Sequence, residues 1–264
     1  MPTTSSVTEQ ILGIPFFDGS PADAVARARQ SGGLVVAPSG TCFARFLEDA
    51  AYRRAIVSAD LALPDSGAMV ALWRLRTGSS LERISGLAYL RRLLFDLSPA
   101  ELADVCWVLP HARAQEKLLA WSAAENSLPA SRDTSVGIDP ARCYLAPTYG
   151  RSVEDEALRA LIAERQPRHV VVAIGAGAQE RLGWWLREHF GSTLAIHCIG
   201  GALGFVTGDQ VAIPDWADRL CLGWFLRFLS QPRAFLPRLW KARVLPALIF
   251  RYGHALPPGS NWSN

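Results

Sequence analysis

The sequence lacks several features that would place the protein in a specialised class. Its longest apolar stretches fall far short of the ~20 residues that a membrane-spanning helix requires. Its five cysteines include no Cys-x-x-Cys pair and have no histidine at metal-ligand spacing. We therefore expect reduced, mostly buried thiols rather than a disulfide framework or a metal centre. The first ten residues, MPTTSSVTEQ, lack the basic and then apolar layout of a secretory signal, so we expect a cytoplasmic protein.

Acidic residues are also missing from the last part of the chain. From Arg219 onward there are seven basic residues and no Asp or Glu, whereas the remainder holds 20 basic and 24 acidic residues, a formal charge of −4. This tail is rich in Trp, Phe and Leu, and three prolines limit its helices to a few turns. Residues 214–264 are thus predicted to form a short helical, basic appendage that docks at a membrane surface. The alternative is a helical pair that packs on the body or on a partner subunit of a homo-oligomer.

The body of the chain alternates apolar strands with helices. The strand interiors are continuously apolar, which is typical of a mostly parallel sheet covered on both faces. We therefore predict a Rossmann-like α/β fold over residues 1–213, with helices on both faces of the sheet. The patterns place strands near 34–40, 61–67, 104–110, 142–150, 169–174 and 193–201, and helices near 20–31, 41–60, 85–98, 112–126, 152–166 and 178–189.

In such folds ligands bind beyond the carboxyl ends of the strands, which directs attention to the loops there. The stretch HVVVAIGAGAQE ends a strand with Gly175 and Gly177 before a helix, as phosphate-binding loops do. A dinucleotide fingerprint, however, needs a third small residue where this chain has Glu180. It also needs an acidic residue at the end of the next strand, and the segment 193–201 has none. These two departures argue against a nicotinamide or flavin dinucleotide.

Two other strand-end loops carry candidate chemistry. Asp65 follows a strand in the segment LPDSG, where its carboxylate would be either a general base facing the crevice or an ordinary turn and capping residue. Gly200 and Gly201 end the last strand and would let the backbone approach a substrate. His111, after the strand near 104–110, either faces the crevice or is simply solvated.

An ordered series of short motifs extends this interpretation from about Val35 to Lys241. The series comprises Pro64-Asp65, Gln179-Glu180 after the glycine turn, Gly200-Gly201, Gly208, Pro214-x-Trp216, Leu222-x-Trp224-x-x-Arg227 and Pro232-Arg233. In this order and spacing it resembles the WecG/TagA/CpsF glycosyltransferases. The resemblance implies an inverting, metal-independent enzyme with no cofactor. Its donor would be a UDP-sugar and its acceptor a polyprenyl-pyrophosphate-linked sugar at the inner face of the cell membrane.

The resemblance also implies roles for individual residues. Asp65 matches the proposed catalytic base, Gln179 and Glu180 match the end of a Pro-Lys-Gln-Glu motif near the donor, and Arg227 and Arg233 match appendage arginines that meet the diphosphate. Arg83 and Gly86 fall where the family has Arg-x-x-Gly. The predicted substrate-binding set is Ser39, Arg83, Gly175, Gln179, Glu180, Gly200, Gly201, Arg227 and Arg233, with no metal ligand.

Several positions depart from the family pattern. Ala37-Pro38-Ser39 replaces Thr-x-Asn, Gly177-Ala178 replaces Pro-Lys, and Leu203-Gly204 replaces a Phe-Asp pair. Loss of hydrogen-bonding groups changes which ligand fits a site, so we expect a donor other than UDP-N-acetylmannosamine, such as UDP-glucose for exopolysaccharide synthesis. The alternative is an inactive sugar-nucleotide-binding or scaffold protein. The basic tail has no nucleic-acid-binding motif beside it, and we expect no nucleic-acid partner.

Overall fold

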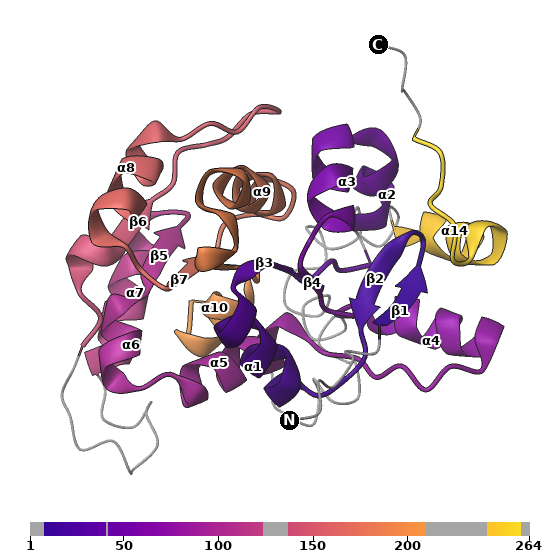
Figure 1. The fold of residues 1–264 in the computed structure, drawn as a ribbon, viewed down its shortest axis with the longest axis horizontal. Helices are drawn as coiled ribbons and strands as arrows, with labels where there is room; N and C mark the ends of the chain where they lie inside the picture. The colour runs from indigo at the N-terminus through magenta and orange to yellow at the C-terminus, as the bar shows by residue number, and fades with distance from the viewer. Residues whose placement is uncertain (1–7, 41, 124–136, 210–241, 260–264) are drawn as a thin grey trace.

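The computed structural model describes residues 8–40, 42–123, 137–209 and 242–259 (Figure 1). In this part of the chain, eight strands form one sheet in the order β1-β2-β4-β3-β8-β7-β5-β6. Strand β1 is antiparallel to β2, and the other neighbouring pairs are parallel. The strands are β1 (Thr8–Ile11), β2 (Ile14–Phe17), β3 (Gly33–Val36), β4 (Leu61–Ala62), β5 (Cys106–Leu109), β6 (Cys143–Leu145), β7 (His169–Val172) and β8 (Ala195–Cys198).

Helices cover both faces of the sheet, and each face has its own apolar core. One face carries α2 (Cys42–Glu48), α3 (Ala50–Val57), α4 (Gly67–Thr77), α8 (Glu156–Arg165), α9 (Ala178–Phe190) and α14 (Val244–Tyr252). The other carries α1 (Pro21–Ser31), α5 (Gly86–Asp96), α6 (Pro99–Asp104), α7 (Ala112–Ala123) and α10 (Ala202–Val206). Figure 1 shows α3 and α9 on one side of the sheet and α1 and α5 on the other. The predicted α/β fold is confirmed.

The central strands explain why the sequence reads as continuous apolar runs. Every residue of β3, β5, β7 and β8 is buried, because helices cover these strands on both sides. Parallel pairing also brings the carboxyl ends of β3, β4, β5, β7 and β8 to one edge of the sheet. The loops that leave this edge form the candidate site described below.

The structure corrects two predicted helix boundaries. The single helix expected over 41–60 is two helices, because the Asp49 carboxylate accepts the Tyr52 N–H at 2.9 Å and starts α3 as its N-cap. The capping box expected at Ser152 and Asp155 is also wrong. Asp155 itself is the N-cap of α8 and accepts the Leu158 N–H at 2.9 Å.

Some elements were not predicted from the sequence at all. The β1–β2 hairpin adds an antiparallel edge to the sheet, and α4 fills the stretch after the Asp65 loop. The sequence of α4 has only a weak amphipathic pattern. Met69, Val70 and Trp73 are buried, whereas the last turn of the helix is exposed. Periodicity alone is a weak signal for such a short helix.

Helix α14, from the predicted appendage, packs on the body. Its residues Leu245, Leu248 and Ile249 are buried, and the backbone after it accepts hydrogen bonds from Leu12 and Gly13 at 2.8 and 2.9 Å. The predicted boundary at 213/214 lies in residues 210–241, outside the described part of the chain. The division into a body and an appendage therefore stays a prediction.

Candidate active site at the carboxyl edge of the sheet

The Asp65 loop lies between β4 and α4. Leu63 still donates to the Val36 carbonyl of β3 at 2.8 Å, but Pro64 has no N–H and cannot extend the ladder. Ser66 then caps α4 by accepting the Met69 N–H at 3.2 Å. A strand stop and a helix cap on either side thus fix Asp65 at the carboxyl edge.

Arg83 and Gly86 hold the Asp65 side chain and backbone. The carboxylate oxygen Oδ1 accepts the Gly86 N–H at 3.1 Å and lies 3.6 Å from Arg83 Nη2, while Arg83 Nε donates to the Asp65 carbonyl at 2.7 Å. Gly86 is the first residue of α5, so its N–H is one of the donors that a helix start leaves without an intrahelical partner. The Asp65 and Arg83 side chains are 23% and 20% exposed, which leaves them reachable from solvent.

The loop after β3 packs against the Asp65 loop. A Cβ added at Gly40 would lie 2.9 Å from Ser66 Oγ, so the two loops touch there. Ser39 Oγ lies 3.3 Å from Cys42 Sγ, and the Ser39 carbonyl accepts the Cys42 N–H at 2.9 Å, which starts α2. Ser39 is therefore in the same loop cluster as Asp65.

The glycine turn after β7 is shaped by Gly177. Its φ of +94° favours glycine, and a Cβ there would overlap the Arg45 guanidinium. Arg45 reaches from α2 and donates to the Ala176 carbonyl inside the turn. Gly175, by contrast, is exposed and has nothing near the position of a Cβ. No sequence motif marked Arg45, because its contact depends on a segment 131 residues away.

Glu180 is a buried helix cap. It is 1% exposed, and its Oε2 accepts the Gly177 N–H at the start of α9. Burial raises the pKa of Glu180, and hydrogen bonds from Gln179 and Gly177 oppose that rise. The Gly177 N–H that a phosphate-binding loop would offer to a ligand is thus already occupied, which agrees with the sequence argument against a dinucleotide.

Gln179 links the glycine turn to the end of β8. Its amide is buried, Nε2 donates to Glu180 Oε1 at 2.8 Å, and Oε1 has no hydrogen-bond partner among the described residues. A Cβ added at Gly200 would lie 3.4 Å from Nε2, so the Gly200-Gly201 turn rests on this amide. A buried acceptor without a partner costs roughly 1–3 kcal/mol, so Gln179 Oε1 lacks a donor that would stabilise it.

A small cavity of about 100 Å³ opens beside the Gly200-Gly201 turn. Its lining includes Leu203 and Gly204 of α10 and His111 from the loop after β5. His111 Nδ1 accepts the Ala114 N–H at 3.1 Å, and Asp209, also in the lining, lies 3.3 Å from Arg113 Nε. His111 lines this cavity and is also exposed to solvent, so the structure does not separate the two alternatives for this residue.

The structure therefore gathers most of the predicted site residues at one edge. Gly86 connects the loops, since a Cβ there would lie 3.5 Å from the Ile199 carbonyl and 3.6 Å from the Ala37 Cβ. Arg227 and Arg233 fall outside the described residues, and their predicted roles are not tested. Within the residues described, no three His, Cys, Asp or Glu side chains cluster as a metal site would require. Metal independence stays a prediction.

Comparison with known protein families identifies one family for the chain. The sequence profile of the glycosyl transferase WecG/TagA/CpsF family matches residues 9–256. The chain belongs to the WecG/TagA/CpsF glycosyltransferase family. This WecG/TagA/CpsF protein is thus a glycosyltransferase of cell-surface polysaccharide synthesis, and the predicted family is confirmed. A comparison with curated proteins finds no match.

The WecG/TagA/CpsF protein has no transmembrane helix in the part of the chain that the structure describes, where every helix is too short or too polar to span a bilayer. Its Asp65 loop, its glycine turn after β7 and the Gly200-Gly201 turn all lie at the carboxyl edge, where α/β folds bind ligands.

Proposed function

We propose that the protein transfers a sugar, with inversion, from a UDP-sugar to a polyprenyl-pyrophosphate-linked sugar. The observation that carries this proposal is the Asp65 carboxylate, which the Gly86 N–H and Arg83 orient at the edge where the strand-end loops meet. In the reaction Asp65 takes the proton of the acceptor hydroxyl as its oxygen attacks the anomeric carbon. The bond from that carbon to the β-phosphate oxygen breaks, and UDP leaves with the electron pair.

The loops around Asp65 supply the remaining parts of this proposal. Ser39, Gly200 and Gly201 would contact the substrates, and a ligand hydroxyl that reaches the Gly200 turn would give Gln179 Oε1 the partner it lacks. Glu180 would act by fixing the glycine turn rather than by touching the donor. Arg227 and Arg233 would neutralise the diphosphate as UDP forms.

The donor that fits these residues best is a plain hexose such as that of UDP-glucose. Leu203 and Gly204 line the cavity at the turn where the family pattern has an acid, and the Asp209 carboxylate in the same cavity lies beside Arg113. A donor sugar without an acetamido group needs fewer polar partners in such a pocket.

A basic and apolar surface supports docking to the inner face of the membrane. It consists of Arg74, Leu75 and Arg76 at the end of α4 with Phe250 and Arg251 of α14, and we call it the α4–α14 surface. Leu75 is 77% and Phe250 51% exposed, and neither helix contains an Asp or Glu. Arg76 donates to the carbonyls of Ile249 and Phe250, which ties the two helices together.

Exposed apolar side chains next to arginines are suited to an anionic lipid surface. Helices α4 and α14 lie together at one end of the molecule in Figure 1. Because α4 begins directly after Ser66 and its 11 residues span about 16 Å, docking through its far end would hold Asp65 close to a lipid-linked acceptor.

A transfer assay with Asp65→Asn tests the proposal. UDP-glucose, UDP-N-acetylglucosamine, UDP-N-acetylmannosamine and UDP-glucuronic acid are each offered with short-chain lipid-pyrophosphate-glucose and -N-acetylglucosamine. We expect turnover with one donor and a loss of roughly 10²–10⁴-fold in Asp65→Asn, as for removal of a general base. Asp96→Asn, at the far end of α5, is the matched control and should keep the wild-type rate.

Two outcomes would count against the proposal. Asp65→Asn with wild-type turnover would remove Asp65 from the base role. UDP binding by wild type without turnover for any donor would favour the inactive scaffold protein. Equal melting temperatures of the two variants would show that the comparison reports chemistry rather than folding.

A further inference from the structure

A second cavity lies at the opposite, amino edge of the sheet. It has a volume of about 290 Å³ and lies between α1, α6 and the start of β7. Its lining is Ala26, Arg29, Gln30, Glu101, Arg168 and His169. None of these residues belongs to the predicted site, and the parallel strands separate this edge from Asp65.

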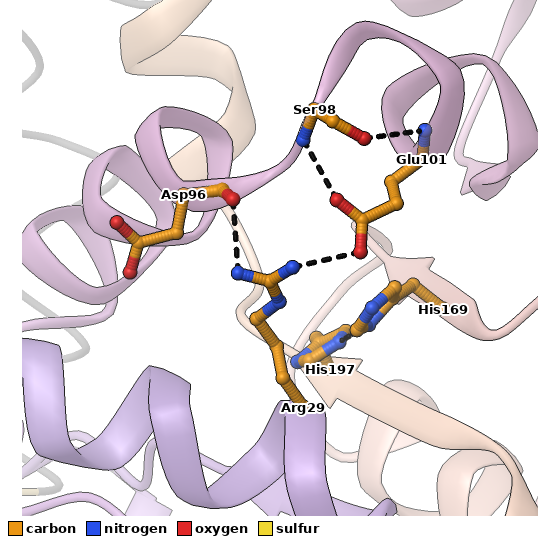
Figure 2. A network of polar contacts seen from close by, with 6 residues as sticks. All are labelled: Arg29, Asp96, Ser98, Glu101, His169 and His197. Atoms are coloured by element: carbon orange, nitrogen blue, oxygen red, sulfur yellow. Dashed lines mark hydrogen bonds and ion pairs between the residues drawn. The ribbon is translucent and has the colours of Figure 1, made fainter.

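A buried chain of three polar side chains ends at this cavity. Tyr89 Oη lies 2.9 Å from His197 Nδ1, and His197 Nε2 lies 3.1 Å from His169 Nδ1. Tyr89 and His197 are fully buried, and His169 is 4% exposed. The two imidazoles stack at 5.3 Å between ring centroids, next to Arg29 in Figure 2.

Counting the hydrogens in this chain of hydrogen bonds indicates which ring nitrogen of His169 carries its hydrogen. If Tyr89 donates to His197 Nδ1, then His197 Nε2–H donates to His169 Nδ1, and His169 carries its hydrogen on Nε2. The reverse direction would leave the fully buried Tyr89 hydroxyl hydrogen without an acceptor, which is unfavourable. The first arrangement is therefore favoured. Burial lowers the pKa of His169 to about 4, so the ring is neutral at pH 7 and has this single hydrogen.

The acids near the cavity already have partners. Glu101 accepts Arg29 Nη2 at 2.7 Å and the Ser98 N–H at 2.8 Å, and Arg29 also donates to the Asp96 carbonyl (Figure 2). Asp104, next to the cavity, lies 2.9 Å from Arg142 Nη2.

The hydrogen-bond donors at the cavity have fewer protein partners than the acids do. His169 Nε2–H and the exposed Arg168 guanidinium have no hydrogen-bond acceptor among the described residues. Because His169 is 4% exposed and lines the cavity, an acceptor for its Nε2–H has to come through the cavity, either as water or as an oxygen of a bound ligand.

We propose that this cavity binds a small oxyanion, a carboxylate or phosphate group, which accepts the His169 Nε2–H and pairs with Arg168. A guanidinium suits the oxygens of either group, and Gln30 adds an amide at the rim. The inference concerns the amino edge alone and does not depend on the proposed transfer reaction.

Nitrogen-15 NMR of the imidazoles tests this site in the full-length protein. Inorganic phosphate and acetate are titrated separately at constant ionic strength, with chloride as the reference salt. We expect His169 to be protonated on Nε2, and its resonance to shift and saturate with one or both oxyanions but not with chloride. Phosphate alone or acetate alone would identify which group the site takes.

Arg168→Gln should weaken this binding at least tenfold. The side chain is exposed, so the variant should fold, and an unchanged His169 resonance in the free protein would confirm it. Arg54→Gln, an exposed arginine of α3 on the other face of the sheet, is the matched control and should bind like wild type. A bare Nε2, a shift that chloride reproduces, or equal affinity in Arg168→Gln would each overturn the proposal.

Discussion

Replacing Gly177 with alanine should destabilise the protein, because the glycine turn after β7 has room for no side chain. Alanine at φ +94° and ψ −53° is strained by about 1–3 kcal/mol. Its methyl would also push the Arg45 guanidinium off the Ala176 carbonyl. Losing this charged but partly solvated hydrogen bond adds about 1 kcal/mol. We expect a total of about 2–4 kcal/mol, or roughly 5–10 °C in melting temperature for a chain of this size.

Gly175→Ala is the matched control in the same turn. No atom lies within 4 Å of the position of its Cβ, and its φ is not in the positive range. Its free energy of unfolding should stay within about 0.5 kcal/mol of wild type. Urea unfolding followed by tryptophan fluorescence measures both variants.

The Arg45→Ala background separates the two contributions. Without the guanidinium, alanine at Gly177 should cost only its backbone strain, so the double-mutant cycle should give a coupling of about 1 kcal/mol. If Gly177→Ala proved as stable as Gly175→Ala, the conformational argument would be refuted. A large loss with zero coupling to Arg45 would refute the steric part alone.

Three further predictions follow from packing, charge and surface. Gly183→Ala should lower the free energy of urea unfolding by about 1–2 kcal/mol despite alanine's helix propensity, because its Cβ would meet side chains of β3 and β8 within 3 Å. A stabilised variant would show that helix propensity dominates. Between pH 4 and 6.5, His169 binds fewer protons in the folded than in the unfolded state. The free energy of unfolding should therefore be level above pH ~6.5 and fall toward pH 4 by up to about 1.4 kcal/mol per pH unit. His169→Gln should reduce this slope, and equal slopes in the variant and wild type would contradict the burial argument. Replacing Leu75 and Phe250 with serine should weaken sedimentation with phosphatidylglycerol vesicles at least tenfold, whereas Phe95→Ser, exposed on α5, should not; equal losses would exclude the α4–α14 surface.

Much of the fold follows from local sequence patterns. The continuous apolar runs of β3, β5, β7 and β8 predict buried parallel strands, and Ser20 with Pro21 predicts the start of α1. The break between α2 and α3 was not predicted, although Asp49 is a good N-cap residue. Its carboxylate also binds Arg181 of α9, a tertiary contact that the local pattern does not contain.

The candidate site was only partly predictable for the same reason. Asp65, Arg83 and Gly86 were singled out separately, and their contact depends on how α5 packs against the end of β8. Glu180 was expected near the donor, but in the structure its carboxylate is buried as a helix cap. A motif gives residue types and order, whereas burial and direction depend on neighbours from distant segments.

Local sequence patterns were enough to identify the family, the α/β class and the strand-end loops that carry Asp65, Gly175 and Gly200. Short-range patterns suffice for these, since strand burial, turns and caps are set by residues a few positions apart. Tertiary structure decided which of those loops touch, that Arg45 shapes the glycine turn, and that His169 and His197 form one buried chain. These contacts join residues that are tens to more than a hundred positions apart. They form only when the packing of both cores brings their segments together.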